Sequence, residues 1–289
     1  MENDIKKYKF KSSLDLQVEI INLEKLTNEK KEHIFIPHRT NFYHIFIFEN
    51  CSPIHFLDFK KIEIKPYSLL FIDNDRVHQF DNSRVYKGKM LIFTDNFYCR
   101  NENDTKFLKS SILFNDLYDI ANFQVKERFN KFMNICNLIE EELVFPADSV
   151  KQDILKNYLH NFLLLADREK RVQDFKEIQK GKDLDYVLLF KDLLENNYKN
   201  LKSVKEYAVK INISEKRLNQ ATSKIVGKSP KELIDDRILL EAKRLLVHGN
   251  QSIKEIGFHL GFEEPTNFTK YFRKHLSKTP IEFRENFNQ

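Results

Sequence analysis

The spacing of hydrophobic side chains divides the chain into two regions with different periods. Between residues 33 and 93, short runs rich in Ile and Phe alternate with turn-forming stretches such as ENCSP and DNDR. Runs of this kind, repeated about every ten residues, are typical of antiparallel strands in a barrel or sandwich. The strands predicted by this pattern are HIFIP, FYHIFIF, IHFLDF, KIEIK, SLLFI and KMLIF. From about residue 107, the apolar positions instead follow the helical period.

Two amphipathic helices and a linker are expected after the strand region. Residues 127–145 place apolar side chains three or four positions apart, and Pro146 ends this run. Asp148 can cap a following helix over 149–168, so the two helices would form a hairpin. The apolar stripes of this hairpin either pack on the strand domain or form part of a homodimer interface. The charged segment 169–182 lacks apolar periodicity and is interpreted as an interdomain linker.

The strongest pattern in the chain is an internal repeat in its last third. The tetrad SVKE at 203–206 recurs 49 residues later as SIKE at 252–255. Each tetrad can form a capping box, in which the serine oxygen accepts an amide proton and the glutamate reaches back to the serine amide. The repeat therefore predicts two short helices, over 203–210 and 252–260.

A three-residue turn and a second helix follow each short helix. The turns INI and LGF are centred on Asn212 and Gly261, two residue types that tolerate a positive φ. Ser214 can cap the second helix of the first copy, and Pro265 suits the first position of its counterpart. Helix, short turn and helix, written twice, is the helix-turn-helix arrangement.

The outward faces of the two second helices are basic and polar. Lys and Arg suit phosphates and guanine, whereas Asn and Gln suit adenine edges. A helical repeat with a purely structural role, which is the alternative, would show acidic or mixed faces at these positions. We therefore predict DNA binding by Lys216, Arg217, Asn219, Gln220, Lys224, Lys228, Thr266, Asn267, Lys270, Arg273 and Lys274.

A helix of about 231–248 is expected to separate the two copies. Its length of about 27 Å could set the two second helices roughly one duplex turn, about 34 Å, apart. The predicted binding site is asymmetric and is contacted in two successive segments of the major groove.

Charge and composition add to this picture. Residues 182–289 contain 20 Lys and Arg against 15 Asp and Glu, which accounts for the whole net charge of +5. A basic domain next to a neutral one agrees with a nucleic-acid partner. There is no apolar run long enough for a membrane span and no secretory signal, so we expect a cytoplasmic protein without membrane contact. The three cysteines lack metal-site spacing and are expected to be reduced thiols.

The second copy carries the stretch IKEIGFHLGFEEPTNFTKYFRKHLSKTPIEFR, with a Gly-Phe pair, a Phe-x-x-x-Phe helix, a Thr-Pro pair and a final Phe-Arg. In these features residues 184–287 resemble the DNA-binding domain of the AraC/XylS family of bacterial transcription regulators. The resemblance implies that 214–226 and 265–276 are the recognition helices, with promoter DNA and RNA polymerase as partners. Three features depart from the family pattern: Ala221-Thr222 stands where an aromatic residue is usual, Ser277 replaces a common glycine, and Gln220 stands where Arg is frequent.

The order of the regions resembles the same family and implies an α+β fold class. It implies a cupin-like antiparallel β-barrel over 1–106, a helical, dimerising segment over 107–168, the linker 169–182 and an all-α DNA-binding domain over 183–289 with two helix-turn-helix units. In that family the barrel can bind a small-molecule effector. The candidate pocket residues are His38, His44, Phe46, Phe48 and His78, although simple packing is the alternative for the histidines.

The competing functions are a cupin enzyme and a structural DNA-bending protein. Metal-binding cupins need a His-x-His pair with further ligands, and Thr40 breaks that pair after His38. There is also no nucleophile motif and no phosphate-binding glycine loop. We therefore expect no catalytic residues, no metal and no cofactor. The polar, asymmetric recognition faces favour sequence reading over bending, whereas activation or repression is left open.

Overall fold

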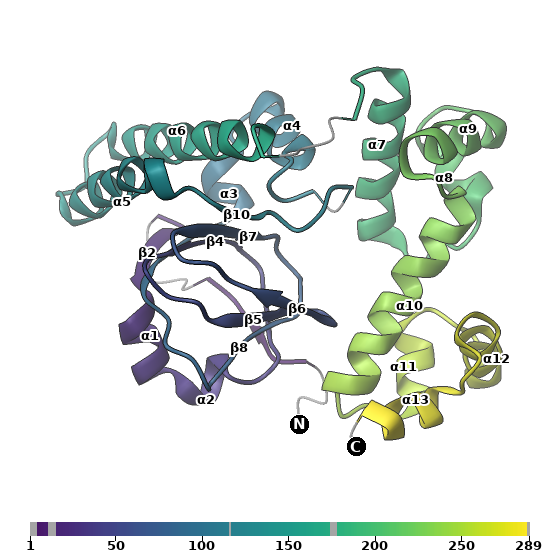
Figure 1. The fold of residues 1–289 in the computed structure, drawn as a ribbon. Helices are drawn as coiled ribbons and strands as arrows, with labels where there is room; N and C mark the ends of the chain where they lie inside the picture. The colour runs from purple at the N-terminus through teal and green to yellow at the C-terminus, as the bar shows by residue number, and fades with distance from the viewer. Residues whose placement is uncertain (1–4, 11–15, 116, 174–177, 288–289) are drawn as a thin grey trace. The chain divides into compact units, whose positions relative to one another are not determined.

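The computed structural model describes residues 5–10, 16–115, 117–173 and 178–287. Residues 6–177 form one compact unit, here called the N-terminal unit, and residues 178–289 belong to a second, the C-terminal unit. The described strands all lie in the N-terminal unit, whereas the described elements of the C-terminal unit are helices (Figure 1). The predicted combination of a sheet-rich part and a helical part is therefore confirmed.

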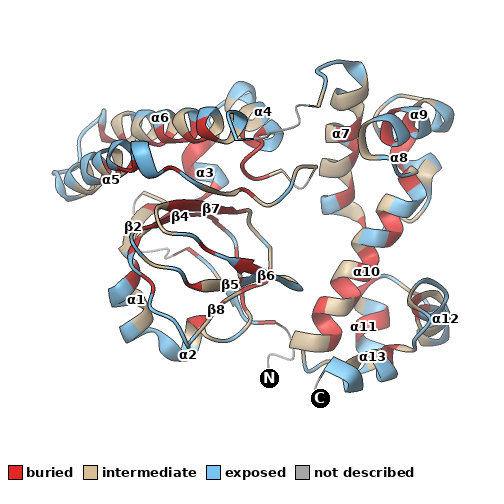
Figure 2. Ribbon diagram, in the orientation of Figure 1, coloured by how far each residue is buried: buried red, intermediate tan, exposed pale blue. Residues whose placement is uncertain are grey.

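A five-stranded antiparallel sheet forms the centre of the N-terminal unit. Its strands follow the order β10, β7, β4, β9, β2. Their bounds are Asn122–Gln124 for β10, Ser68–Ile72 for β7, Tyr43–Phe48 for β4, Gly88–Phe93 for β9 and Val18–Asn22 for β2. Every residue of β4 and β7 is buried, because both faces of the sheet are covered (Figure 2).

The alternation of side chains along β4 sends them into two separate cores. Tyr43, Ile45 and Ile47 pack with the helices that follow the strand region. Phe46 and Phe48 point to the other face, into a core shared with the smaller sheet. This explains why the strand reads as a continuous apolar run in the sequence.

The smaller sheet has three strands in the order β6, β5, β8. These are Lys60–Glu63, Ile54–Leu57 and His78–Phe80, and a parallel pair joins β1 at Lys7–Tyr8 to β3 at Arg39–Thr40. Among the described residues, these pairings form three separate sheets and do not close into a ring. The unit is therefore sheet-rich, but its strand pairing is not that of the closed barrel predicted.

One predicted strand was wrong, and one observed strand was missed. HIFIP was predicted as a strand, but α2 occupies Lys31–Ile34 and follows α1 at Leu23–Glu29. The side chain of Asn22 accepts the amide of Lys25 and caps α1. No side-chain cap starts α2, at whose end Ile34 is buried in the core. The strand β2 precedes these helices and was not predicted.

The helical part of the N-terminal unit starts earlier than residue 107. The four helices are α3 at Asp95–Tyr98, α4 at Glu102–Ser110, α5 at Phe129–Val144 and α6 at Lys151–Arg171. Asp148 accepts the amides of Val150 and Lys151, so the predicted role of its carboxylate before the second helix is confirmed. The ammonium of Lys151 donates to the carbonyl of Leu143 at 2.9 Å and closes the tip of the hairpin.

The apolar stripe of α6 is used inside the N-terminal unit. Leu155, Leu159 and Phe162 are fully buried and share one core with α5 and the five-stranded sheet. The interpretation in which this stripe packs on the strand domain therefore accounts for most of its apolar surface.

The C-terminal unit consists of seven described helices. They are α7 at Lys182–Asn197, α8 at Val204–Lys210, α9 at Glu215–Val226, α10 at Pro230–His248, α11 at Ile253–His259, α12 at Pro265–Leu276 and α13 at Pro280–Phe287. Figure 1 shows α8 and α9 beside one end of α10, and α11 to α13 beside the other. The 19 residues of α10 give a rod of about 28 Å.

Reciprocal capping starts four helices of this unit. The two predicted capping boxes, of Ser203 with Glu206 and of Ser252 with Glu255, are confirmed. Ser229 with Glu232 starts α10 in the same way. Before α13, the amide of Thr279 donates to the carboxylate of Glu282, and the amide of Glu282 donates to the hydroxyl of Thr279. Each helix of the repeat thus begins at a point that short-range chemistry determines.

The two turns have the backbone geometry that the sequence predicts. Asn212 has a φ of 56° and Gly261 a φ of 76°, both in the left-handed region. At Gly257, an added Cβ would lie 3.3 Å from the Cβ of Phe268, so the absence of a side chain lets α12 approach α11. Ser277 ends α12 with a φ of 57°, where Gly227 ends α9 with a φ of 74°.

Gly261→Ala and Gly227→Ala form a matched pair that tests the close approach at the second turn. Both glycines have a left-handed φ, which alone costs an alanine about 1 kcal/mol. A Cβ on Gly261 would also meet the carbonyl oxygen of Lys199 at 1.8 Å, whereas nothing lies within 4 Å of one on Gly227. We expect Gly261→Ala to lower the free energy of unfolding by clearly more than Gly227→Ala in urea titrations. Equal losses would show that the turn can move away from Lys199.

Candidate nucleic-acid interface

The second helix of the second copy, α12, has one apolar and one polar face. Phe268 and Phe272 are fully buried and hold the helix against the rest of its unit. All five predicted DNA-binding side chains of this helix are exposed, namely Thr266, Asn267, Lys270, Arg273 and Lys274. They leave α12 on the side away from its buried face, so the helix presents a continuous polar and basic surface to solvent.

The second helix of the first copy, α9, is divided in the same way. Leu218, Ala221 and Thr222 are buried, so the small residues at the departure from the family pattern still form the inward face. Lys216, Asn219 and Gln220 are exposed. The serine hydroxyl of Ser214 accepts the amide of Arg217 at 3.1 Å and caps the helix as predicted.

Arg217 and Lys224 differ from the other predicted residues, because both are bound to a carboxylate of α7. Asp183 pairs with the guanidinium of Arg217 through one oxygen and with the ammonium of Lys224, at 2.8 Å, through the other. The guanidinium also lies 5.0 Å from the ring centroid of Tyr186, a cation–π contact. The hydrogen bonds from Lys224 and Arg217 hold the pKa of Asp183 below its usual range.

The sequence analysis did not identify Asp183 because its partners lie 34 and 41 residues further along the chain. The only local signal was a short charged stretch at the end of the predicted linker. Lys228 is also paired, to Asp236 at 2.7 Å, although both side chains are half exposed. Exposed pairs of this kind are weak, about 0–1 kcal/mol, so Lys228 can exchange partners readily.

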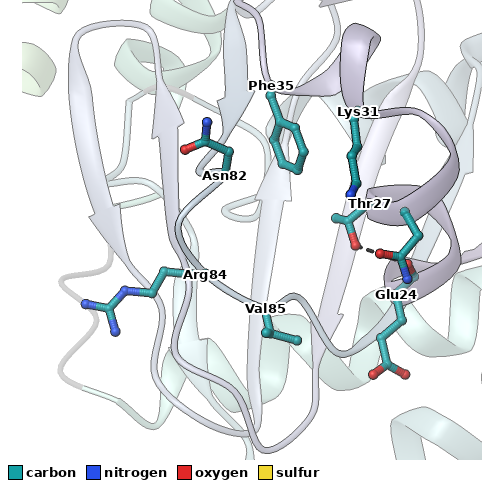
Figure 3. Close-up of a pocket in the computed structure, with 8 residues that line it drawn as sticks. Glu24, Thr27, Lys31, Phe35, Asn82, Arg84 and Val85 are labelled. Atoms are coloured by element: carbon teal, nitrogen blue, oxygen red, sulfur yellow. Dashed lines mark hydrogen bonds between the residues drawn. The ribbon is translucent and has the colours of Figure 1, made fainter.

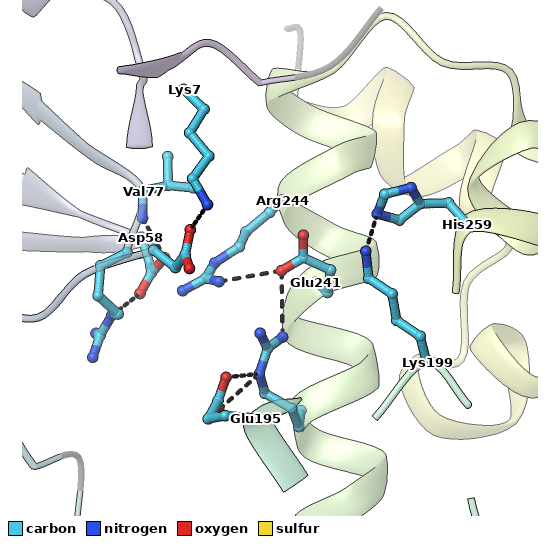
Figure 4. Close-up of polar contacts among 11 residues, drawn as sticks. Lys7, Asp58, Val77, Glu195, Lys199, Glu241, Arg244 and His259 are labelled. Atoms are coloured by element: carbon cyan, nitrogen blue, oxygen red, sulfur yellow. Dashed lines mark hydrogen bonds and ion pairs between the residues drawn. The ribbon is translucent and has the colours of Figure 1, made fainter. Parts of the chain in front are cut away.

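The scaffold helix α10 carries a buried group of charges. Glu241, only 1% exposed, accepts hydrogen bonds from Arg237 at 3.3 Å and Arg244 at 3.2 Å (Figure 4). Arg237 also donates to both carboxylate oxygens of Glu195 on α7 at 2.8 Å. Burial disfavours the charge of Arg237, but Glu195 and Glu241 outweigh this effect and raise its pKa. The network ties α7 to α10.

A second polar contact fastens α12 to α10. The hydroxyl of Tyr271 donates to the buried carboxylate of Asp235 at 2.7 Å, and Lys231 donates to the same oxygen at 2.8 Å. Nearby, Lys199 and His259 share a hydrogen bond of 2.8 Å (Figure 4). The two recognition helices are therefore held to the scaffold by different chemistry.

In the N-terminal unit, the predicted pocket residues come together in the interior. His38, His44 and His78 are all at least 97% buried. The ring centroid of His78 lies 4.3 Å from that of His38 and 4.6 Å from that of His44. His55 joins this group and shares a hydrogen bond of 3.2 Å with His78. Phe46 and Phe48 are fully buried; the ring centroid of Phe46 lies 4.9 Å from that of His55, and Phe48 stacks on Phe46 at 5.6 Å. Within the described residues, no three potential ligands are arranged to hold a metal ion.

Burial keeps the histidine cluster neutral. Desolvation lowers the pKa of His38 to about 4 and that of His55 to about 3, and it lowers the pKa of His44 and His78 well below the usual value. Nδ1 of His44, Nδ1 of His55 and Nε2 of His78 make no hydrogen bond within the described structure. A proton on any of these rings would therefore be a poorly compensated buried charge.

A surface pocket of the N-terminal unit lies apart from the histidine cluster (Figure 3). It is formed by the first two helices and the loop before β9. Its lining consists of Glu24, Thr27, Asn28, Lys31, Phe35, Asn82, Arg84 and Val85. None of the pocket residues predicted from the sequence contributes to it. Within the described part of the chain, no helix is long and apolar enough to cross a membrane.

The histidine cluster predicts acid sensitivity of the N-terminal unit. Below pH 6.5 the unfolded chain takes up protons, whereas His38 and His55 in the folded chain do so only near pH 4 and 3. Stability is therefore complete above pH 6.5 and falls with decreasing pH, by about 1.4 kcal/mol per unit for each such ring. We expect His55→Phe to reduce this slope in urea unfolding between pH 7 and 5. An unchanged slope would contradict the assignment.

Comparison with known proteins identifies the helical repeat. A family model described as a helix-turn-helix domain matches residues 207–286. The lactose operon transcription activator of Staphylococcus xylosus is 31% identical over 97 residues, which cover 34% of this chain and 35% of the activator. The HTH-type transcriptional activator RhaS of Pectobacterium carotovorum subsp. carotovorum is 23% identical over 263 residues, 86% of this chain and 88% of its own.

A solved structure described as a transcriptional regulator with an AraC-type DNA-binding domain, from Chromobacterium violaceum, is similar at 25% identity. It has a TM-score of 0.33 and covers 37% of this chain and 95% of its own. The chain thus spans only about a third of the length of the S. xylosus activator, but most of RhaS. Residues 207–286 thus match a helix-turn-helix domain, and the chain is similar to transcription activators that carry such a domain.

Proposed function

We propose that this protein is a sequence-specific DNA-binding regulator that inserts α9 and α12 into two successive major-groove segments of promoter DNA. The observation that carries the proposal is a pair of related helix-turn-helix units whose second helices expose basic and amide side chains from apolar anchors. A single scaffold helix, α10, joins the two helix-turn-helix units and keeps them in one compact body. Such an arrangement suits simultaneous reading of two segments on one face of a duplex.

The exposed side chains divide by chemistry into two roles. Lys216, Asn219 and Gln220 on α9, and Thr266, Asn267 and Lys270 on α12, are proposed to contact base edges. Arg273 and Lys274 follow on the last turns of α12 and are proposed to contact phosphates, as is Lys228. Arg217 and Lys224 form a separate group, because Asp183 holds both.

Selection of bound duplexes from a random DNA pool, followed by footprinting of a single bound chain, tests the proposed function. We expect an asymmetric site with two protected segments about one helical turn apart. Protection of one segment alone would restrict binding to one unit. Recovery of no preferred sequence would contradict sequence-specific regulation and would favour a DNA-bending role.

Lys270→Ala and Lys274→Ala separate base reading from phosphate contact. Loss of a bidentate base contact at Lys270 should weaken binding to the selected site by about 1–3 kcal/mol and relax discrimination at one or two base positions. Loss of Lys274 should weaken binding to the selected and the random duplex alike. It should also reduce the salt dependence of the binding constant by about one released counterion. Titrations of both duplexes at several salt concentrations measure this. If the two variants behave identically, the division of roles is wrong.

For the N-terminal unit, we infer a cupin-like regulatory domain that modulates DNA binding. Its two facing sheets enclose an aromatic and histidine core, which supports a cupin-like arrangement without a bound metal. A small-molecule effector would need either the surface pocket or a rearrangement of the histidine cluster. We further infer that the protein has no enzymatic activity and that contact with RNA polymerase transmits its effect.

Dimerisation is proposed through the tip of the α5–α6 hairpin. Leu138, Val144, Phe145 and Val150 are exposed there, and Val144 is 87% exposed. Two copies on one promoter would raise the effective affinity by proximity. We expect a dimer in sedimentation at micromolar concentration and mostly monomer for Val144→Asp with Phe145→Ser. A wild-type monomer, with or without DNA, would exclude this part of the proposal.

A further inference from the structure

Two of the three basic side chains of α9 are already bound to a carboxylate of the same unit. Arg217 and Lys224 are seven residues apart, so they lie two turns apart on one flank of α9. That flank packs along α7, where Asp183 stands in the first turn. The arginine side chain is 34% exposed and that of Asp183 only 18%, so the pair is shielded on the side of α7.

The second recognition helix lacks this arrangement. Fifty residues after Arg217 and Lys224, α12 carries Asn267 and Lys274 on the same flank. Among the described residues, no carboxylate pairs with Lys274. The polar contact of α12 is instead the hydrogen bond from Tyr271 to Asp235 on α10, which leaves the outward charge of α12 unchanged.

Binding to the DNA backbone gains free energy mainly when cations release the counterions condensed on phosphates. A lysine or arginine that is already paired contributes less, because a phosphate oxygen must first replace the carboxylate. If the pair stays intact, the carboxylate remains near the duplex and offsets one positive charge. In both cases the sequence-independent attraction of the first helix-turn-helix unit to DNA is reduced. Its hydrogen bonds to base edges are not weakened.

We propose that Asp183 is a specificity-determining residue. It competes with DNA phosphates for Arg217 and Lys224 and thereby limits sequence-independent binding by the first helix-turn-helix unit. This inference rests on the proposed function of the two recognition helices. Tyr186 supports the competition, because its ring holds the guanidinium beside Asp183. The first helix-turn-helix unit then adds to DNA affinity chiefly at sites that offer suitable bases to Lys216, Asn219 and Gln220.

The matched variants are Asp183→Asn and Asp185→Asn in the full chain. Both remove one negative charge from the first turn of α7, but the exposed Asp185 has no ion pair within the described structure. Affinity is measured for a random-sequence duplex and for the selected site, at several salt concentrations. We expect Asp183→Asn to tighten random-duplex binding by roughly threefold or more, with a salt slope steeper by about 0.9 to 1.8. The selected site should gain less, so the specificity ratio falls.

A second pair of variants separates pairing from long-range charge. In a background with Arg217→Gln and Lys224→Gln, Asp183→Asn should have no larger effect than Asp185→Asn. Circular dichroism melts of each variant establish that the helices remain folded. Equal effects of the two Asn variants in the natural background, or a persistent effect of Asp183→Asn in the Gln background, would overturn the inference. Failure of the wild-type chain to prefer any sequence would instead overturn the proposed function, so the two failures are distinguishable.

Discussion

Both helix-turn-helix units depend on one helix, because α10 belongs to the core of each. Ile234, Ile238 and Ala242 are fully buried along it, and Glu241 and Arg244 are buried with them. Buried charges remain stable only when each has a partner, and removal of one partner typically costs about 3–5 kcal/mol. The network of Glu195, Arg237, Glu241 and Arg244 therefore restricts how α7 and α10 can be placed. Every contact of the recognition helices with the scaffold is built on that placement.

The C-terminal unit could be predicted closely because its signals are local. Capping boxes, a left-handed turn residue and a proline at the first helical position each act over fewer than six residues. These features set the ends of the helices, and periodic apolar residues then determine which face is buried. The sequence consequently predicted the helices from α8 to α12 and the exposure of most of the candidate residues.

The features that could not be predicted arise from contacts between distant parts of the chain. Nothing near Asp183 indicates that it would bind two cations of α9, since helix packing alone brings them together. The histidines of the N-terminal unit show the same limitation. His55 joins His78 through pairing of β5 with β8, which places two residues 23 positions apart side by side. The error at HIFIP also concerns context, because β propensity depends on the surroundings and Ile34 is buried at the end of α2, a helix without a side-chain cap.

The unequal chemistry of the two recognition helices gives the protein a direction on DNA. A dimer of identical reading heads related by a twofold axis binds a palindrome, and turning that site around changes nothing. Here α9 and α12 expose different side chains, so the site for one chain has a distinguishable beginning and end. Inverting such a site within a promoter would reverse the orientation of the bound protein relative to the start of transcription. Orientation, as well as sequence and position, thus becomes part of the information that a gene must preserve.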